Sequence, residues 1–196
     1  TLVDENVGRL LDALDETGLA ERTIVVFTAD HGDLMGEMGL THKGPWPLEG
    51  MINIPMIWRV PGASAAAGGR SGGLFSSVDI SPTVLELLGV EVPRAMDGLA
   101  QAELVRGGSG ARDAAMMEFR TAVGDNVRTL VTPDRKLSLY AGRPEGELYD
   151  MTENLPEATN RWDDPAWADD RHRLTRRLLD EILLTSDEKL WPGAGA

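Results

Sequence analysis

Residues 23–32 read Thr-Ile-Val-Val-Phe-Thr-Ala-Asp-His-Gly, an apolar run that ends abruptly in a carboxylate, an imidazole and a glycine. A run of β-branched and aromatic residues without polar alternation predicts a parallel strand that is covered on both faces. Open α/β sheets bind their ligands just beyond the carboxyl ends of such strands. We therefore expect Asp30 and His31 to lie where the chemistry takes place.

The chemistry of these residue types suits an anionic ester. Cleavage of a sulfate or phosphate ester builds negative charge on oxygen, which a divalent cation and a fixed ammonium stabilise. A carboxylate and a neutral imidazole, such as Asp30 and His31, are suitable ligands for that cation. Lys43 follows twelve residues later and could fold back over the same site. Taken alone, however, Asp-His-Gly is also typical of a turn in which Asp caps a backbone amide.

A longer stretch carries a family resemblance. Residues 30–44 read Asp-His-Gly-Asp-Leu-Met-Gly-Glu-Met-Gly-Leu-Thr-His-Lys-Gly, and residues 54–62 read Ile-Pro-Met-Ile-Trp-Arg-Val-Pro-Gly. Together they resemble the second metal-binding segment of the sulfatase family, within the alkaline phosphatase superfamily. The resemblance implies that Asp30 and His31 are metal ligands and that Lys43 is a catalytic residue that binds the sulfate group. His42 could assist in binding substrate, or it is an exposed loop histidine.

The same resemblance implies a cofactor and a mechanism. Calcium is the expected divalent metal, with manganese or zinc as alternatives because one ligand is an imidazole. In the intact enzyme, a hydrated formylglycine attacks sulfur while the metal polarises the ester and Lys43 neutralises the sulfate. One departure from the family pattern is Asn53, where a basic residue usually precedes the second strand.

Parts of that machinery have no counterpart in these 196 residues. The chain has no cysteine and no Cys/Ser-x-Pro/Ala-x-Arg motif, from which formylglycine is made, and it lacks the family's first pair of aspartate ligands. Thr1 is not a natural start, and residues 2–16 have the apolar periodicity of an amphipathic helix that Gly18 could end. We therefore expect the carboxyl-terminal portion of a sulfatase, with the amino-terminal portion of the same enzyme missing and little or no turnover by this chain alone.

The rest of the chain fits that placement. Residues 54–60 predict a second strand, and residues 61–73 have the composition of a surface loop. In the next predicted helix, Ser81 could cap the start and Gly89 could end it. Asp79 could be a catalytic acid, but a carboxylate that favours the adjacent helix start is the simpler interpretation.

Beyond residue 108 the pattern changes to short strands and turns. Strands are predicted at 114–119, 127–132 and 136–140, with turns at 124–126 and 133–134. Residues 147–150 resemble the Glu-Leu-Tyr-Asp turn of the sulfatase carboxyl-terminal subdomain. Residues 169–184 predict a final amphipathic helix. Trp162 and Trp167 could anchor this helix to the sheet, or they could line a substrate cleft.

The predicted fold class is therefore α/β: the carboxyl-terminal part of an alkaline-phosphatase-like α/β sandwich, followed by a small antiparallel sheet packed with a terminal helix. We divide the chain at residues 1–107, part of the catalytic domain, and 108–196, a small α+β subdomain. Half a sheet leaves an open edge and an uncovered apolar face, so self-association is expected.

Charge limits the partners. The chain is 42% hydrophobic, with a formal charge of −13 and a pI near 4.6. This balance argues against a nucleic-acid partner, and no apolar run is long enough for a membrane span. The expected substrate is a sulfate-ester small molecule or glycan. The alternatives are a phosphonate or phosphodiester hydrolase of the same superfamily and a noncatalytic binding or assembly module on this scaffold.

Overall fold

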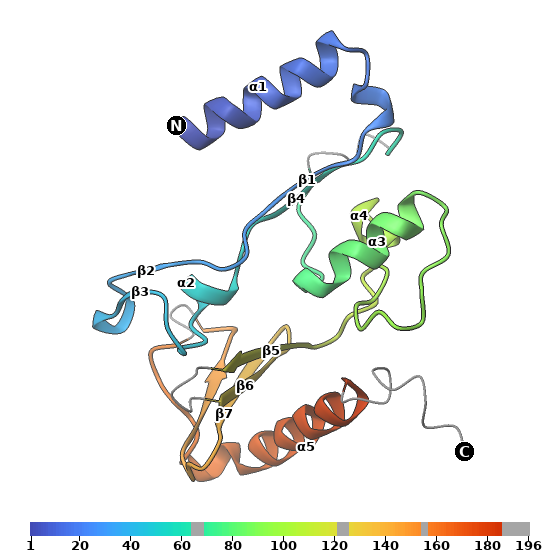
Figure 1. The fold of residues 1–196 in the computed structure, drawn as a ribbon. Coiled ribbons are helices and arrows are strands. Elements are labelled where there is room, and N and C mark those ends of the chain that lie inside the picture. The colour runs from blue at the N-terminus through green and yellow to red at the C-terminus, as the bar shows by residue number, and fades with distance from the viewer. Residues whose placement is uncertain (64–68, 121–125, 154–156, 186–196) are drawn as a thin grey trace.

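The computed structural model describes residues 1–63, 69–120, 126–153 and 157–185. Figure 1 shows an elongated arrangement, with helix α1 at one end and a sheet covered by helix α5 at the other. The helices are α1 (Leu2–Glu16), α2 (Glu49–Ile52), α3 (Ile80–Leu87), α4 (Ala102–Val105) and α5 (Ala168–Thr185), and the strands are β1 (Val25–Thr28), β2 (Leu34–Met35), β3 (Thr41–His42), β4 (Met56–Arg59), β5 (Ala115–Arg120), β6 (Asn126–Val131), β7 (Arg135–Tyr140) and β8 (Gly146–Asp150).

The two apolar strands of the amino-terminal half pair with each other. β1 runs antiparallel to β4, with Val26 opposite Trp58 and Phe27 opposite Ile57. The expectation of a parallel strand was therefore wrong for the pairing that the described residues make. An unbroken apolar run reports how a strand is covered, but it carries no information about the direction of its neighbour. Within this chain β1 is also not covered on both faces, because its Phe27 side chain is 36% exposed.

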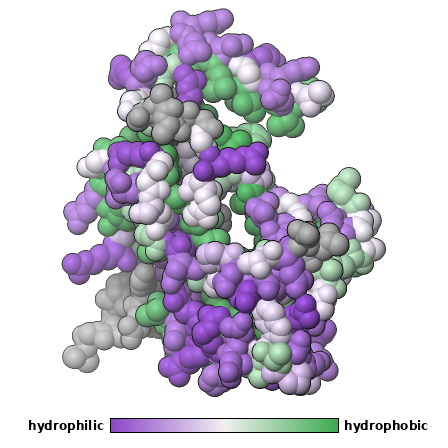
Figure 2. All heavy atoms as spheres, turned by 180° about the vertical axis from the view of Figure 1, so that it is seen from behind, coloured by the Kyte–Doolittle hydropathy of each residue, from purple (hydrophilic) through white to green (hydrophobic). Residues whose placement is uncertain are grey.

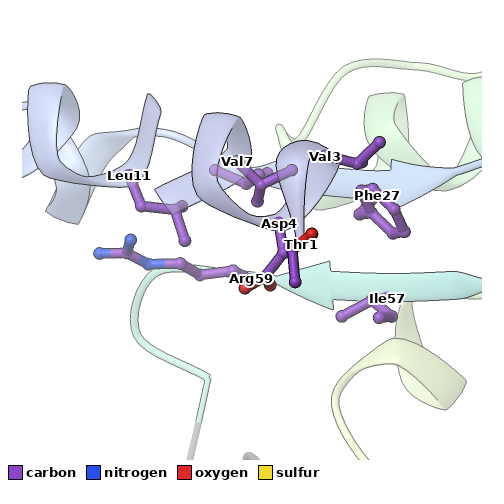
Figure 3. A pocket seen from close by; sticks show the side chains of 9 residues that line it. Thr1, Val3, Asp4, Val7, Leu11, Phe27, Ile57 and Arg59 are labelled. Atoms are coloured by element: carbon purple, nitrogen blue, oxygen red, sulfur yellow. The ribbon is translucent and has the colours of Figure 1, made fainter. Parts of the chain in front are cut away.

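Helix α1 has the predicted bounds, and its apolar face is not buried. Gly18, at φ 68°, ends the segment as expected, yet no residue of α1 is buried and Leu10 is 69% exposed. A groove opens between α1 and the β1–β4 pair, lined among others by Val7, Leu11 and Phe27 (Figure 3). From behind, apolar atoms lie along the side of α1 that faces the rest of the molecule (Figure 2). The apolar face is therefore present and largely uncovered by this chain.

A buried polar cluster around Asp79 holds residues 76–112 together. A 3₁₀ turn at Ser77–Asp79 precedes α3, and its capping residue is Ser76 rather than the predicted Ser81. The start lies earlier because the Asp79 carboxylate accepts a hydrogen bond from the Ser76 backbone N–H, which completes a capping box. Gly89, at φ 70°, follows the helix as predicted.

Asp79 does more than favour a helix start. Its fully buried carboxylate accepts hydrogen bonds from the Leu99 backbone N–H, the Gln101 amide and the Arg112 guanidinium. These contacts fix Asp79 inside the fold, so the interpretation as a catalytic acid gains no support from its surroundings. The ion pair to Arg112 also ties α3 to the segment that leads into β5.

The carboxyl-terminal half is an antiparallel sheet in the order β5-β6-β7-β8. Leu130, Leu137 and Leu148 lie side by side across β6, β7 and β8, and they pack against Leu174 and Leu178 of α5. Side chains alternate between the two faces of a strand, so this single register supplies one apolar face for the helix. The bounds of α5 differ by one residue at each end from the predicted helix.

The last strand of the sheet and the two tryptophans beside α5 bear on two further predictions. Residues 147–150 were expected to form a turn but belong to β8, because Leu148 is fully buried opposite Leu137 and burial outweighs the turn signal. Trp162 and Trp167 both pack on the core beside α5, which confirms the anchoring role.

The predicted turn at 124–126 falls mostly outside the described residues. Among the described helices, none is long and apolar enough to cross a bilayer.

Candidate metal and anion site

The Asp-His-Gly segment follows β1 directly and rests on α2. The Gly32 N–H donates to the Met51 carbonyl at 2.8 Å. A Cβ atom at Gly32 would lie 1.9 Å from the carbonyl oxygen of Gly50, far inside van der Waals contact. Gly32 is therefore required for space, and its side-chain-free backbone lets the loop lie directly on α2.

Three of the predicted side chains come together at this point. The Lys43 ammonium lies 3.4 Å from Nε2 of His31, and that Nε2 lies 3.6 Å from Oδ2 of Asp30. The turn through β2 and β3 returns the chain to the end of β1, which places Lys43 beside residues twelve positions earlier. The sequence-based expectation that these three groups share one environment is met by the geometry.

The hydrogen bonds of His31 define which nitrogen faces the site. Nδ1 lies 2.8 Å from the Gly32 carbonyl oxygen, which can only accept, so Nδ1 carries the hydrogen. Nε2 then presents its lone pair toward the Lys43 ammonium, which can only donate. An imidazole held through Nδ1–H to a backbone carbonyl is the usual arrangement of a histidine that binds metal through Nε2.

Asp30 forms the predicted capping turn and keeps its second carboxylate oxygen accessible. Its Oδ1 accepts the backbone N–H of His31 at 2.9 Å, which is the capping turn. That hydrogen bond, the neighbouring His31 ring and, more weakly, Lys43 lower the pKa of Asp30 below its ordinary value. The Asp30 side chain is 87% exposed, so Oδ2 is an ionised and accessible oxygen beside His31.

The donor set fits part of a divalent metal site. Protein oxygen and nitrogen ligands lie about 2.0–2.5 Å from such an ion, so two ligand atoms of one ion are at most about 5 Å apart. The 3.6 Å between Asp30 Oδ2 and His31 Nε2 satisfies that limit. No group of three or more His, Cys, Asp or Glu side chains that could hold a metal occurs among the described residues. An ion at Nε2 also requires the Lys43 ammonium to move aside.

The other polar residues of the loop lie differently. His42 is exposed, with a left-handed backbone at φ 66°, and pairs with Leu34 through the β2–β3 ladder. In the part of the chain that the structure describes, no hydrogen bond joins the His42 side chain to Asp30, His31 or Lys43. Its assisting role stays a prediction.

Glu37 and Glu49 have local backbone or side-chain partners. Glu37 accepts the Met35 N–H at 2.5 Å, and a hydrogen bond from its own backbone N–H together with that from Met35 lowers the pKa of Glu37. Glu49 accepts a hydrogen bond from the Asn53 side-chain amide at 3.0 Å. Asn53, which stands where the family usually has a basic residue, is therefore hydrogen-bonded to the first residue of α2.

Comparison with known proteins agrees with this assembly of elements and site. Residues 1–90 match the family model described as Sulfatase. Two curated relatives are an arylsulfatase of Clostridium perfringens, 29% identical over 93% of this chain, and an N-acetylglucosamine-6-O-sulfatase of Bacteroides thetaiotaomicron, 34% identical over 91%. The chain belongs to the sulfatase family. It spans 38% and 33% of the lengths of those two relatives.

Solved structures share the fold. A phosphonate monoester hydrolase from Silicibacter pomeroyi superposes with a TM-score of 0.85 at 27% identity, over 96% of this chain and 40% of the other. A structure solved in complex with its substrate D-glucosamine-2-N,6-O-disulfate gives a TM-score of 0.81 at 29% identity, over 95% of this chain and 39% of the other. The predicted fold class, an α/β unit followed by an antiparallel sheet and a terminal helix, is confirmed.

Sequence reasoning missed one buried ionic contact near the site. Lys136 in β7 is 1% exposed and reaches the segment that links Lys43 to α2. The available signal was a lysine inside a strand whose other residues are mostly apolar. Because exposed lysines are common on edge strands, that signal alone does not indicate burial.

Proposed function

We propose that this chain supplies one side of the active site of a metal-dependent sulfuric ester hydrolase. Asp30 and His31 contribute two ligands of a divalent ion, with calcium first among the ions that suit the site and manganese or zinc as alternatives. Lys43 is the catalytic cation that binds the sulfate. The observation that carries this proposal is the meeting of Asp30 Oδ2, His31 Nε2 and Lys43 Nζ within successive distances of 3.6 Å and 3.4 Å.

The residues of this chain would act by holding charge in fixed positions. When bound, a divalent ion supplies electrostatic stabilisation of the ester oxygens. Gly32 holds His31 in the tautomer that offers Nε2, and Asp30 stays ionised because its pKa is lowered. Lys43 stands at the end of a short hairpin, from which a small movement carries its ammonium from the imidazole to an anionic oxygen.

We further propose that the nucleophile and the remaining metal ligands come from sequence outside these residues. The chain has no cysteine, it presents two ligands at the site, and the curated relatives are more than twice as long. The 196 residues alone should therefore show no measurable turnover of an aryl sulfate. Turnover by the purified chain at a rate that falls with Asp30→Ala would refute this division of the site.

Metal binding can be tested on the chain itself by NMR, because it has three histidines. Mn²⁺ is paramagnetic and broadens signals of rings that it approaches. It should broaden the His31 ring signals before those of His172 in α5, and added Ca²⁺ should reverse the effect. Asp30→Ala should weaken the broadening, whereas Asp33→Ala, which removes a neighbouring exposed loop acid, should not. Equal effects of the two variants would show that the ion is held only by general negative charge.

Catalytic roles require an enzyme in which these residues are joined to a nucleophile-bearing segment. In such an enzyme, Lys43→Ala should lower kcat for an aryl sulfate by about 10²–10³, the effect typical of losing one fixed electrostatic stabiliser. His42→Ala separates the two interpretations of His42, since a rise in KM with unchanged kcat would indicate substrate binding. Equal rates for the parent enzyme and its Asp30→Ala variant, with and without added metal, would contradict the metal role.

A neighbouring chemistry has support from the comparisons. A phosphonate monoester hydrolase is among the structures that share this fold, and a phosphonate ester places similar charge on similar oxygens. Rates on a phenyl phosphonate and on an aryl sulfate, measured side by side, decide between the two substrates. The other alternative is a noncatalytic binding or assembly module, which predicts that no Cys/Ser-x-Pro/Ala-x-Arg motif precedes this sequence in its gene.

The substrate class that we favour is a sulfate ester, either a small molecule or a glycan. One related structure holds a disulfated glucosamine and one relative is named for a sulfated N-acetylglucosamine. A panel of aryl, choline and hexosamine sulfates would rank these options for the complete enzyme.

A further inference from the structure

One ionic contact crosses from the carboxyl-terminal sheet to the segment that carries the site. Lys136 lies in β7, and its ammonium donates to the Pro47 carbonyl at 2.8 Å. It also forms an ion pair with Glu157, and it lies 3.9 Å from Oε1 of Glu49. Lys136 therefore contacts the 47–49 segment, which begins four residues beyond Lys43.

Glu157 completes the contact from the other side. Both oxygens of its carboxylate lie 3.0 Å from the backbone N–H of Glu49, the first residue of α2. A carboxylate that accepts this N–H satisfies one of the donors that the start of a helix leaves without a partner. Lys136 and Glu157 thus hold the two ends of one short stretch, the Pro47 carbonyl and the Glu49 amide.

That stretch is rigidly connected to the metal-binding residues. α2 follows it at once, and the Met51 carbonyl accepts the N–H of Gly32. Because Gly32 has no room for even a Cβ atom against Gly50, a shift of α2 either pushes the loop that carries Asp30 and His31 or strains its hydrogen bond to Met51. Leu34, Leu48 and Met51 form a small buried cluster beneath the same loop, which makes the segment one packed unit.

The two faces of β7 separate this contact from the sheet's own core. Leu137 and Leu139 pack toward α5, together with Arg135, which pairs with Asp170 of that helix. Lys136 projects from the opposite face, as alternation along a strand requires. Figure 1 shows the corresponding layers, with α5 on one side of the sheet and the segment containing α2 on the other.

Burial of this ammonium is costly. Burial lowers the pKa of Lys136 to about 8, and the carboxylates of Glu49 and Glu147 act in the opposite direction. An apolar side chain at such a position is often as stabilising as a buried ion pair, so the stability of the fold does not by itself require a lysine here. What the lysine adds is a set of directed contacts to the Pro47 carbonyl and the Glu157 carboxylate.

We propose that Lys136 and Glu157 are positioning residues, through which the carboxyl-terminal sheet sets the geometry of Asp30, His31 and Lys43. The role in the reaction rests on the proposed function, but the mechanical coupling does not. Loss of either residue should let α2 shift on the sheet and change the surroundings of His31, without unfolding the sheet itself.

The three histidines allow a direct test on the 196-residue chain. Ring signals are assigned by single His→Gln variants, and amide exchange is followed at Gly32 and Met51. Lys136→Met and Glu157→Gln should each shift the His31 ring signals and speed exchange at Gly32 several-fold, while His172 in α5 stays unchanged. If the two residues act as one unit, the double variant should shift His31 no further than the larger single variant.

The matched control is Arg135→Met, one residue away on the same strand. It removes a cation with its own ion pairs to Asp150 and Asp170, so it loosens the sheet and α5 without touching the 47–49 segment. It should perturb His172 and leave His31 in place. A variant that merely destabilises the fold would move both rings, so this pattern distinguishes positioning from general loss of stability.

Several outcomes would overturn the proposal. One is unchanged His31 signals and Gly32 exchange in a folded Lys136→Met or Glu157→Gln chain. Another is an equal response of His31 to Arg135→Met. Should Lys136→Met fail to fold, Glu157→Gln alone decides, because it keeps the size of the side chain and an oxygen acceptor.

Failure of this proposal is distinguishable from failure of the proposed function. Broadening of the wild-type His31 signals by Mn²⁺ tests metal binding and does not involve Lys136. If Mn²⁺ has no effect but the variants shift His31, the coupling stands and the metal role falls. If Mn²⁺ broadens His31 and the variants leave it unmoved, the metal role stands and the coupling falls.

Discussion

Gly32→Ala tests the packing on which the site depends. The added Cβ would lie 1.9 Å from the Gly50 carbonyl oxygen and 2.9 Å from the Gly50 carbonyl carbon, both backbone atoms that cannot turn away like a side chain. Ordinary contact begins near 3.4 Å. The loop and α2 must therefore separate by about 1.5 Å, the difference between these distances, which exceeds what a packed interior absorbs without strain.

The cost can be worked out from two contributions. Overpacking against backbone costs about 1–3 kcal/mol. Separation also breaks the hydrogen bond from Gly32 to the Met51 carbonyl, which contributes about 1 kcal/mol. We therefore expect the free energy of unfolding to fall by roughly 2–4 kcal/mol. A displaced His31 should also lose its preferential broadening by Mn²⁺.

Urea denaturation followed by circular dichroism measures the first effect, and the His31 ring signals report the second. Gly8→Ala is the matched control, because nothing lies within 4 Å of the corresponding Cβ position in the middle of α1. It should stabilise the chain by up to about 1 kcal/mol through helix propensity. A Gly32→Ala chain that unfolds at the wild-type urea concentration and keeps its His31 signals would refute the packing described here.

Three further predictions concern other parts of the chain. Arg112→Met leaves the Asp79 carboxylate buried without its cation and should cost about 3–5 kcal/mol in urea denaturation; a loss below 1 kcal/mol would mean that the pair behaves like a surface ion pair. Ile57→Lys should reduce self-association in light scattering because Ile57 lines the groove beside α1, whereas Leu88→Lys, equally exposed at 61% but outside that groove, should not; a wild-type chain that is strictly monomeric would contradict the expected self-association. The hydrogen bond from Arg173, with help from Arg135, lowers the pKa of Asp170 in the folded chain below its ordinary value of 3.8. The ionised Asp170 therefore stabilises the fold fully above pH 3.8, and this stabilisation is lost as the pH falls through the lowered pKa. Asp170→Asn should therefore flatten the decline in urea midpoint below about pH 4, and an unchanged decline would exclude this ion pair as its source.

Local patterns in the sequence determined much of this protein. The periodicity of residues 2–16 and of 169–184 was sufficient to place α1 and α5, because one apolar stripe per 3.6 residues has few other interpretations. The Asp30–His31 pair and Lys43 were recognised from residue types and spacing together with a family resemblance. These features depend on residues close together in the chain, or on a loop short enough to bring them together.

Tertiary contacts decided the rest. The direction of β1 depends on which strand lies beside it, and 147–150 became a strand because Leu148 fits between its neighbours in the core. The carboxylate of Asp79, which was expected only to favour a helix start, is buried because partners 20 to 33 residues away surround it. In each case a contact distant in sequence outweighed a local preference worth about 1 kcal/mol or less.

The contact of Lys136 and Glu157 with the start of α2 shows most clearly the difference between what local sequence and what tertiary contacts determine. The sequence by itself determined the strand and the candidate metal-binding loop, since apolar pattern and residue chemistry are properties of short segments. Only the tertiary structure decided that a lysine of that strand is buried against this loop, 89 positions along the chain from Pro47. The energy of a buried charge depends on which partners surround it, and those partners are brought together only when the chain folds.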